Sequence, residues 1–366
     1  MTVPVLVPAP MPGESSPMSD PSTGRRRGAR APTIIDVAAR AGVSKSLVSL
    51  VLRGKGPPLV SAERRELVLH AVAELGYRPN GMARGLAQQR TGLLGVLVSD
   101  LRNPFFAELA ESVDAEAARR GYRAVLAAGH RNAEREQLVV NDFLESRVEA
   151  LVLLSPALSA AAITRTVGGV PVVVEGRPTF RSARVDLVGT DDALGAELAV
   201  RHLVELGHSD IAHIAGTAPG AAARRKGYEL AMRTHRRGQY VQVVGSDETD
   251  SAGYEVARRL LGGPDRPTAV FAVNDVVALS VLAAAEDLEI RVPEELSVVG
   301  FDDIYLAGLR GVGLTTVAQP VDEIATTMVG ALLSRIEGSG ENRPAVRQWL
   351  PPTLTVRRTT AAAPGD

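Results

Sequence analysis

Residues 33–52 read TIIDVAARAGVSKSLVSLVL, and this stretch decides the fold of the N-terminal part of the chain. Thr33 precedes apolar residues at helical spacing, and Asp36 puts an acid where a capping box places Glu or Gln. Gly42 ends this first helix, and Ser44 can cap a second one. The pattern predicts a helix, a tight turn and a second helix within about twenty residues.

The segments on either side of this stretch extend the prediction. A third helix is expected over Ala62–Leu75, with Ser61 as its cap and Gly76 as its end. Residues 1–32 are rich in Pro, Ser, Gly and Arg and show no apolar period, so we expect a disordered arm there.

Beyond Gly92, apolar strand runs alternate with amphipathic helices, which is typical of parallel βα units. The expected strands are Leu93–Val98, Ala124–Ala127, Ala150–Leu154, Val170–Val174, Ile211–Ile214, Gln239–Val244, Ala269–Val273 and Ser297–Val299. The helices include Phe105–Arg120, Ala133–Ser146, Asp192–Leu206, Ala222–Arg237, Ala252–Leu261 and Val276–Asp287. So many strands favour two doubly wound lobes, with a ligand cleft at the carboxyl ends of the strands.

The charge is divided between the two parts of the chain. The 366 residues carry a formal net charge of −1, but residues 1–90 hold 13 Lys and Arg against 6 Asp and Glu. The remainder holds 28 basic and 36 acidic residues. A basic head on an acidic body favours a polyanion as partner of the head, and a charged tail without a partner is the alternative.

Several classes of protein are disfavoured. The chain has no Cys, which excludes disulfides and thiolate chemistry and fits a reducing compartment. No apolar run approaches the ~20 residues of a membrane-spanning helix and no export signal is evident, so we expect a cytoplasmic protein. No phosphate-binding loop, nucleophile elbow or zinc-protease motif occurs, and His202, His208 and His213 have the look of surface or helix-end residues. We therefore expect no enzyme activity, no cofactor and no metal.

Further short motifs follow residues 33–52 in order. They are Gly76–Asn80, Ala83–Ala87, Arg90–Gly92, Asn103–Phe106, His202–His208, Asn274–Asp275, Ser297–Asp303, Leu314–Val317 and Arg357–Thr360. The series closely resembles the LacI/GalR family of bacterial transcription regulators, and the likeness runs from residue 33 to about residue 362.

The resemblance implies an N-terminal all-α helix-turn-helix head and an α/β periplasmic-binding-protein-like body of two doubly wound lobes. We expect an arm, a DNA-binding head, a hinge helix with linker, an effector-binding and dimerisation body, and a tail, at residues 1–32, 33–78, 79–91, 92–362 and 363–366. A homodimer is expected, because the leucine heptads that make the lactose repressor a tetramer have no counterpart after the last motif.

The second helix of the head is expected in the major groove of DNA. Lys45, Ser46 and Ser49 would face base edges, whereas Leu47 would contact a thymine methyl or belong to the core of the head. Relatives commonly have Arg where this chain has Leu50. The remaining expected DNA contacts are Thr33 and Ser44, and Arg53 as a substitute for the missing Arg.

The segment Asn80–Ala87 resembles the family's hinge helix, which enters the minor groove and places a Leu between base steps. That Leu is Leu86, and Asn80, Ala83 and Arg84 would contact DNA beside it. A helix this short that contains two Gly residues should form mainly when two copies pair on DNA. A plain linker is the alternative.

The resemblance also assigns an effector cleft. Its expected residues are Asp100, Asn103, Phe105, Phe106, Arg224, Glu248, Asn274, Asp275 and Asp302. Arg opposite Asp can grip adjacent hydroxyls, which is the usual chemistry of sugar recognition. As structural alternatives, Asn103 would shape a turn, Phe105 would be core and Asp275 would cap a helix. Many relatives have an aromatic residue where this chain has Glu248. The acidic side chain of Glu248 favours a more polar or cationic ligand here.

Together these observations predict a dimeric, sequence-specific DNA-binding repressor. A small molecule, a sugar or a related metabolite, would control its affinity for a near-palindromic operator. The alternatives are a two-lobed small-molecule binding protein and an α/β enzyme, either of them without a DNA role.

Overall fold

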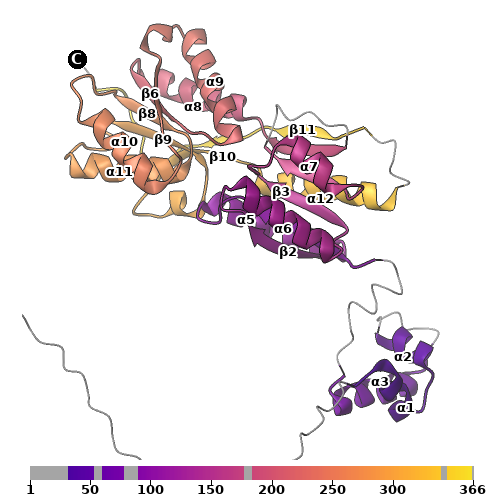
Figure 1. Ribbon diagram of the computed structural model, residues 1–366. Coiled ribbons are helices and arrows are strands. Elements are labelled where there is room, and N and C mark those ends of the chain that lie inside the picture. The colour runs from indigo at the N-terminus through magenta and orange to yellow at the C-terminus, as the bar shows by residue number, and fades with distance from the viewer. Residues whose placement is uncertain (1–31, 53–59, 78–89, 177–183, 339–343, 365–366) are drawn as a thin grey trace, which may run out of the picture. The chain divides into compact units, whose positions relative to one another are not determined.

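The computed structural model describes residues 32–52, 60–77, 90–176, 184–338 and 344–364. The chain divides into two compact units, Met1–Arg84 and Gly85–Asp366, which are called the head and the body below (Figure 1). The predictions for the arm up to residue 31, Arg53 and the hinge residues Asn80, Ala83, Arg84 and Leu86 lie outside the described residues.

The head contains three described helices whose ends follow local sequence signals. They are α1 (Ile34–Ala41), α2 (Lys45–Leu52) and α3 (Ala62–Leu75). The Thr33 side chain accepts a hydrogen bond from the Asp36 backbone N–H, and the Asp36 carboxylate accepts one from the Thr33 N–H at 2.7 Å. Asp therefore completes a capping box here. Gly42 and Gly76, with φ of 64° and 61°, end α1 and α3 in the left-handed conformation that glycine adopts freely.

Valine and alanine residues form the buried core of the head. Val37, Val48 and Val68, one from each helix, are fully buried and belong to one hydrophobic cluster. The half-buried Leu47 packs against this cluster. Leu47, which was expected either in the core or against a thymine methyl, therefore contributes to the core and keeps a partly accessible surface.

The first lobe of the body, called the N-terminal lobe below, is a six-stranded parallel sheet of order β11-β5-β4-β3-β1-β2. Its strands are β1 (Leu93–Val98), β2 (Arg123–Ala128), β3 (Ala150–Leu154), β4 (Val172–Glu175), β5 (Val185–Thr190) and β11 (Arg347–Leu350). Its helices are α5 (Pro104–Arg119), α6 (Ala133–Glu145), α7 (Ala160–Val167) and α12 (Val321–Glu337). Because β1 and β3 are covered on both faces, they are almost entirely buried and apolar.

The second lobe, the C-terminal lobe, has the order β12-β10-β9-β8-β6-β7. Its strands are β6 (Ile211–Ala215), β7 (Gln242–Gly245), β8 (Ala269–Ala272), β9 (Ser297–Asp302), β10 (Thr315–Ala318) and the antiparallel β12 (Thr353–Thr355). Helices α8 (Asp192–Glu205) and α9 (Pro219–Thr234) cover one face, and α10 (Asp250–Leu261) and α11 (Asp275–Asp287) cover the other (Figure 1). The two short turns η1 (Gly238–Tyr240) and η2 (Tyr305–Gly308) complete this lobe.

The chain passes between the lobes three times, after β5, after β10 and after β11. The crossings are joined to one another: the Thr190 hydroxyl donates to Gln319 Oε1 at 2.5 Å, and the Asp191 N–H donates to the Leu350 carbonyl at 2.9 Å. Three hydrogen-bonded connections form a hinge about which two rigid lobes can change their closure.

The prediction of two doubly wound lobes is confirmed, with differences in detail. The sequence prediction did not include β5, β10, β11, β12, α7 or α12. Strand β7 begins at Gln242 rather than Gln239, because η1 occupies the preceding residues. Helix α9 is displaced toward the N-terminus by three residues relative to the expected Ala222–Arg237.

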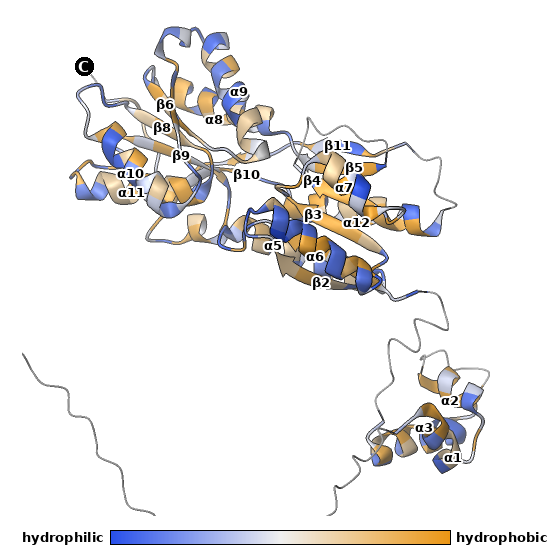
Figure 2. Cartoon of the chain, viewed as in Figure 1, coloured by the Kyte–Doolittle hydropathy of each residue, from blue (hydrophilic) through white to orange (hydrophobic). Residues whose placement is uncertain are grey.

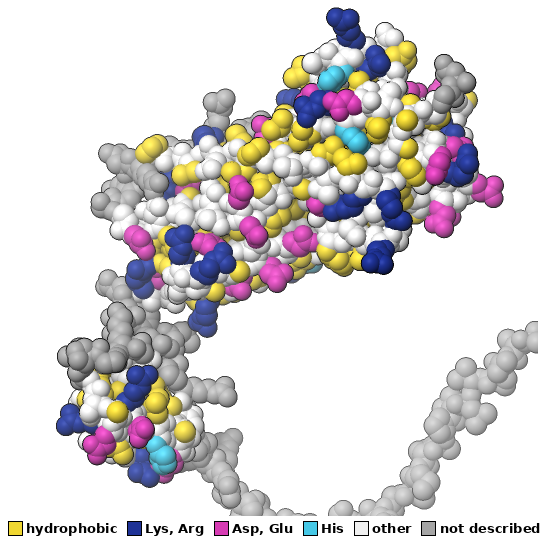
Figure 3. All heavy atoms as spheres, turned by 180° about the vertical axis from the view of Figure 1, so that it is seen from behind, with side chains coloured by type: hydrophobic (Ala, Val, Ile, Leu, Met, Phe, Trp, Pro, Cys, Tyr) yellow, Lys and Arg dark blue, Asp and Glu magenta, His cyan; other side chains and the backbone are white. Residues whose placement is uncertain are grey.

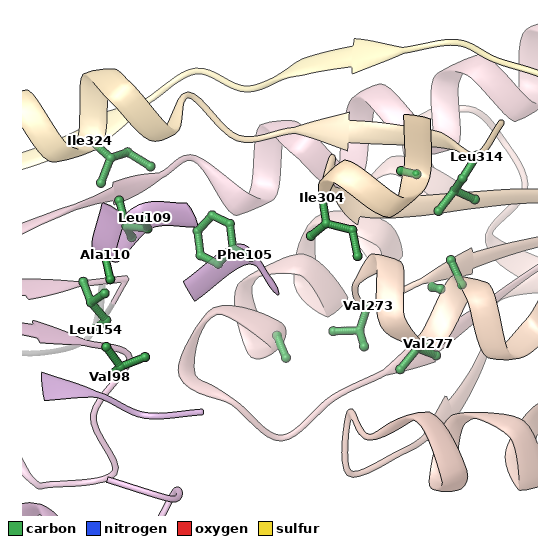
Figure 4. Packing of buried hydrophobic residues seen from close by; sticks show 14 of the residues in the cluster. Val98, Phe105, Leu109, Ala110, Leu154, Val273, Val277, Ile304, Leu314 and Ile324 are labelled. Atoms are coloured by element: carbon green, nitrogen blue, oxygen red, sulfur yellow. The ribbon is translucent and has the colours of Figure 1, made fainter. Parts of the chain in front are cut away.

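One hydrophobic cluster extends through both lobes. Apolar residues lie along the interior strands while hydrophilic residues cover the outer faces of the helices (Figure 2). Phe105 at the start of α5 is 3% exposed and lies between Leu109 of its own lobe and Ile304 of the other (Figure 4). Phe105 is therefore a core residue, as the structural alternative expected, and its ring joins the interiors of the two lobes. It also lines a small cavity between the lobes, where the family resemblance placed it.

Candidate effector cleft and DNA-reading head

Adjoining cavities lie between the lobes of the body, where strands of both sheets end. An inner cavity of about 40 Å³ and a middle cavity of about 290 Å³ share Asn103, Phe106, Ser155, Ala218, Glu248 and Asn274. An outer cavity of about 770 Å³, which includes Asp100 and Glu248, continues along α10 and α11. The cleft therefore lies at the carboxyl ends of the strands, as expected for doubly wound sheets.

Arg224 of α9 forms the floor of the inner cavity. Its Nε donates to Asp192 Oδ1 at 2.8 Å, and its Nη1 donates to the Val273 carbonyl at 2.6 Å. The same Nη1 lies 3.6 Å from Asp302 Oδ1, and the guanidinium carbon lies 3.7 Å from the centre of the Phe301 ring. These contacts hold the buried guanidinium in one orientation.

Asp302 is the second expected residue on this floor. The Gln319 amide donates to its Oδ1 at 2.7 Å, which connects the carboxylate to a lobe crossing. Burial raises the pKa of Asp302 to about 6, although the Arg224 charge opposes that rise. A carboxyl tied both to the floor and to a crossing can transmit a change in the cleft to the hinge.

Glu175 and Asp192 line the inner cavity and were not among the expected site residues. Burial, followed by the charge of Asp192, raises the pKa of Glu175 to about 8. Burial also raises the pKa of Asp192, against the effect of Arg224. Glu175 ends β4, so the rule that ligands bind at strand ends would have identified it, had it been applied to each expected strand.

Glu248 lines all three cavities. Its Oε1 accepts hydrogen bonds from the backbone N–H groups of Thr217 and Ala218, at the N-terminus of α9. The carboxylate therefore caps a helix from a distant loop, and Ala218 provides no side-chain cap of its own.

Asn103 and Asn274 each cap the N-terminus of a helix and also line the cleft. Asn103 Oδ1 accepts from the Phe105 N–H at 3.1 Å, and Asn274 Oδ1 accepts from the Val277 N–H at 2.9 Å. Both residues also line the inner and middle cavities. The alternative that Asn103 shapes the turn is confirmed, and the same side chain also lines the cleft.

Asp275 lies behind the cleft. It is fully buried and lines none of the three cavities described above. Its Oδ2 accepts from the Ile304 N–H at 2.9 Å, and its Oδ1 accepts from the Thr316 hydroxyl at 2.6 Å. This geometry favours a structural role for Asp275 over the ligand contact expected from the sequence.

Contacts made by Arg131 and by Tyr305 connect the lobes across the cleft. Arg131, which follows β2, donates from Nη1 to the Asp247 carbonyl at 2.9 Å. The Tyr305 N–H donates to Glu108 Oε1 at 3.1 Å. Both are easily broken surface contacts, and their pairing is invisible in the sequence because the partners are more than 100 residues apart.

The expectation that the three histidines lie at the surface or at helix ends was wrong for His213. This residue is fully buried in β6, where its ring stacks on Phe271 at 4.8 Å, because β6 lies inside the sheet under two helices. His208 is also buried, within hydrogen-bond distance of Thr268 and Ser297. Among the described residues, no group of three or more His, Cys, Asp or Glu could hold a metal.

The head presents the start of α2 to solvent. Ser44 Oγ accepts from the Leu47 N–H at 3.2 Å, so Ser44 caps the helix. Lys45 and Ser46 are exposed, and Leu47 and Ser49 are half-buried. These are the positions from which a reading helix reaches base edges.

The described part of the head is electrically balanced. It carries four basic residues and four acidic ones, and both kinds are visible on its surface (Figure 3). They are Arg40, Lys45, Arg64 and Arg65 against Asp36, Glu63, Glu66 and Glu74. The basic excess of residues 1–90 therefore lies outside the described helices of the head.

Comparison with known proteins identifies the family. The model for "Bacterial regulatory proteins, lacI family" matches residues 33–80, and that for "Periplasmic binding protein-like domain" matches residues 200–360. The HTH-type transcriptional repressor PurR of Erwinia tasmaniensis is 33% identical over 339 residues, covering 91% of this chain and 98% of that protein. The chain belongs to the lacI family.

Solved structures agree with this membership. The lac repressor dimer bound to operator and the anti-inducer ONPF is 28% identical, with a TM-score of 0.78, over 91% of this chain and all of that one. A complex of the transcriptional regulator CelR with cellobiose is 31% identical, with a TM-score of 0.65, over 90% and 99%. This lacI-family chain is a DNA-binding transcriptional repressor that responds to a small-molecule effector. No described helix is long and apolar enough to cross a membrane.

Proposed function

We propose that this repressor binds a near-palindromic operator as a homodimer and that a sugar or related metabolite in the cleft controls that binding. The observation that carries the proposal is the fixed Arg224 guanidinium among carboxylates, beside cavities lined by both lobes. An Arg paired with carboxylates forms a directional donor and acceptor surface suited to hydroxyl groups. The operator-bound lac repressor dimer and the cellobiose complex of CelR support the two partners.

We propose two groups of DNA contacts, one around helix α2 and one in the segments that follow it. Lys45, Ser46 and Ser49 would read base edges from α2, Leu47 would offer its accessible surface to a thymine methyl, and Thr33 and Ser44 would lie near phosphates. Arg53 and the hinge residues Asn80, Ala83, Arg84 and Leu86 would add contacts from outside the described residues.

The division of labour follows from these roles. Residues 33–78 would read DNA, 79–91 would form the hinge helix, and 92–362 would bind effector and dimerise, with an arm before and a tail after. Binding in the cleft would favour one degree of closure about the three crossings and so shift the population of DNA-competent dimers. The proposal includes no catalytic step, and it places the protein in the cytoplasm, where the DNA is.

The test is fluorescence anisotropy with labelled fragments of the DNA flanking the protein's own gene. We expect salt-sensitive binding that selects one fragment over the others by at least about 10³-fold, and a change in that affinity with one small molecule. Equal binding to all fragments would refute the repressor proposal. Lys45→Ala is the variant that should lose the selected fragment, with Arg65→Ala on the exposed surface of α3 as its control.

A further inference from the structure

The lining of the inner and middle cavities is strongly acidic. Among the described residues, five acidic and two arginine side chains line them, and no Lys or His does. The acidic residues are Asp100, Glu175, Asp192, Glu248 and Asp302, and the arginines are Arg131 and Arg224. A ligand in these cavities therefore meets an excess of carboxyl groups.

The arginines of the cleft are already engaged by the protein. Arg224 holds Asp192 and the Val273 carbonyl, and Arg131 donates to the Asp247 carbonyl. Arg102, which lines the outer cavity, forms an ion pair with Asp100 at 3.0 Å. An anionic ligand would have to displace one of these contacts to obtain a cation.

The start of helix α9, which faces the cleft, is also occupied. The N-terminus of the 16-residue helix α9 opens toward the cavities, and such termini bind phosphates and carboxylates through free N–H groups. Here Glu248 Oε1 accepts from the N–H of Thr217 and from that of the N-cap residue Ala218, the two residues that precede the first helical residue, Pro219. The protein itself fills this position with a negative charge.

The local backbone is shaped for this contact. Glu248 has φ of 70°, a left-handed conformation that is costly for a residue other than glycine. A Cβ at Gly216 would lie 2.1 Å from Glu248 Oε1, so a glycine is needed where the carboxylate approaches the chain. Two special backbone positions thus keep the carboxylate at the end of α9.

We propose that the buried end of the effector carries a protonated amine on a small hydroxyl-bearing molecule, such as an amino sugar, and that Glu248 excludes ligands whose buried end is a phosphate or a carboxylate. This inference rests on the proposed function of the cleft. Three buried carboxyls surround the single Arg224, and an ammonium group would satisfy the excess.

The first experiment measures ligand charge preference on the full-length protein. Hexoses and pentoses are each offered as the neutral sugar, the amino sugar and the sugar phosphate, for example glucose, glucosamine and glucose 6-phosphate. Thermal shift and titration calorimetry rank them. We expect the amino form of the preferred sugar to bind at least about tenfold more tightly than its neutral form, a difference of about 1.4 kcal/mol. Equal binding of the neutral form, or tightest binding of a phosphate, would overturn the inference.

The second experiment opens the end of α9 in the variant Glu248→Gly, which also relieves the backbone conformation. Inorganic phosphate is the probe. We expect at least about tenfold tighter phosphate binding than in the wild type, since the Thr217 and Ala218 N–H groups at the start of α9 become free and a negative charge is lost. The control Glu134→Gln removes an exposed acid from the first turn of α6, away from the cavities, and should leave phosphate binding unchanged. No gain in Glu248→Gly, or an equal gain in the control, would refute the role of Glu248.

Anisotropy on the selected DNA fragment, run with the same ligands, separates the two proposals. Release of DNA by a sugar phosphate alone would overturn the charge preference and leave the effector-controlled repressor intact. The absence of any selected fragment would overturn the repressor proposal itself.

Discussion

Replacing Arg224 with Met should destabilise the body far more than any exposed charge change. The side chain is buried on the floor of the cleft, where it donates to Asp192 Oδ1 at 2.8 Å and neutralises the surrounding carboxyls. Its removal leaves Asp192 and Asp302 without their cation in a buried site. The unfolded chain loses nothing comparable, because there the carboxylates are solvated.

The expected loss of stability follows from the burial of the ion pair between Arg224 and Asp192. Breaking a buried ion pair by removing one partner costs about 3–5 kcal/mol. The stacking of the guanidinium on Phe301 is part of that loss. At roughly 2–4 °C per kcal/mol for a large domain, we expect Tm to fall by about 6–20 °C.

Thermal and urea unfolding of the wild type and the variant measure the loss. Arg225→Met is the matched control, because Arg225 is the next residue of α9 and pairs with Glu229 on the exposed surface at 2.9 Å. Its cost should stay below about 1 kcal/mol. The Arg224→Met loss should also shrink from pH 8 to pH 5, since the pKa of Asp302, which burial raises to about 6, lets this carboxyl become neutral as the pH falls. A loss equal to that of the control would refute this account of the floor.

Three further outcomes are expected. The raised pKa of Glu175 keeps a proton on the folded state that the unfolded chain has released, so the stability of the wild type falls as the pH rises from about 4.5 to 8. Glu175→Gln should remove part of this pH dependence. Parallel curves of Tm against pH for the two proteins would contradict this account. Gly216→Ala should displace the Glu248 carboxylate and lower Tm by several degrees. The control Gly245→Ala, whose Cβ meets no atom within 4 Å, should leave Tm unchanged. Calorimetry compares the two variants, and equal Tm values would exclude a close approach at Gly216. Leu86→Ala should weaken binding to the selected fragment much more than binding to random DNA, and equal losses in anisotropy would rule out a minor-groove wedge.

The helix ends of the head were predictable because their signals are local. Thr33 and Asp36 are three residues apart, and their capping box forms within one helical turn. Gly42 and Gly76 end helices through their own backbone conformation. The long apolar runs of β1 and β3 were equally clear, because a strand buried on both faces needs no polar alternation.

The cleft was only partly predictable. Asn103 and Asn274 follow strands, so the strand-end rule and the family motifs both placed them correctly beside the cavities. Asp275 has a motif position as clear as theirs, yet its carboxylate turns away to Thr316 and Ile304. The partners of a side chain depend on which segments fold against it, and adjacent residues in one motif can face different neighbours.

By itself, the sequence determined the helical head, the alternation of strands and helices in the body, and the family. Only the tertiary structure decided that the chain crosses between the lobes three times, that α12 and β11 return to the N-terminal lobe, and that Glu175, Asp192 and Arg224 share one floor. The physical reason is that periodicity reports which face of an element is buried, whereas its neighbours are set by the competition of all segments for the same apolar surface and the same free strand edges. Short and polar strands such as β10 and β12 are stable only through that long-range pairing, so the hinge that they build is a property of the folded chain.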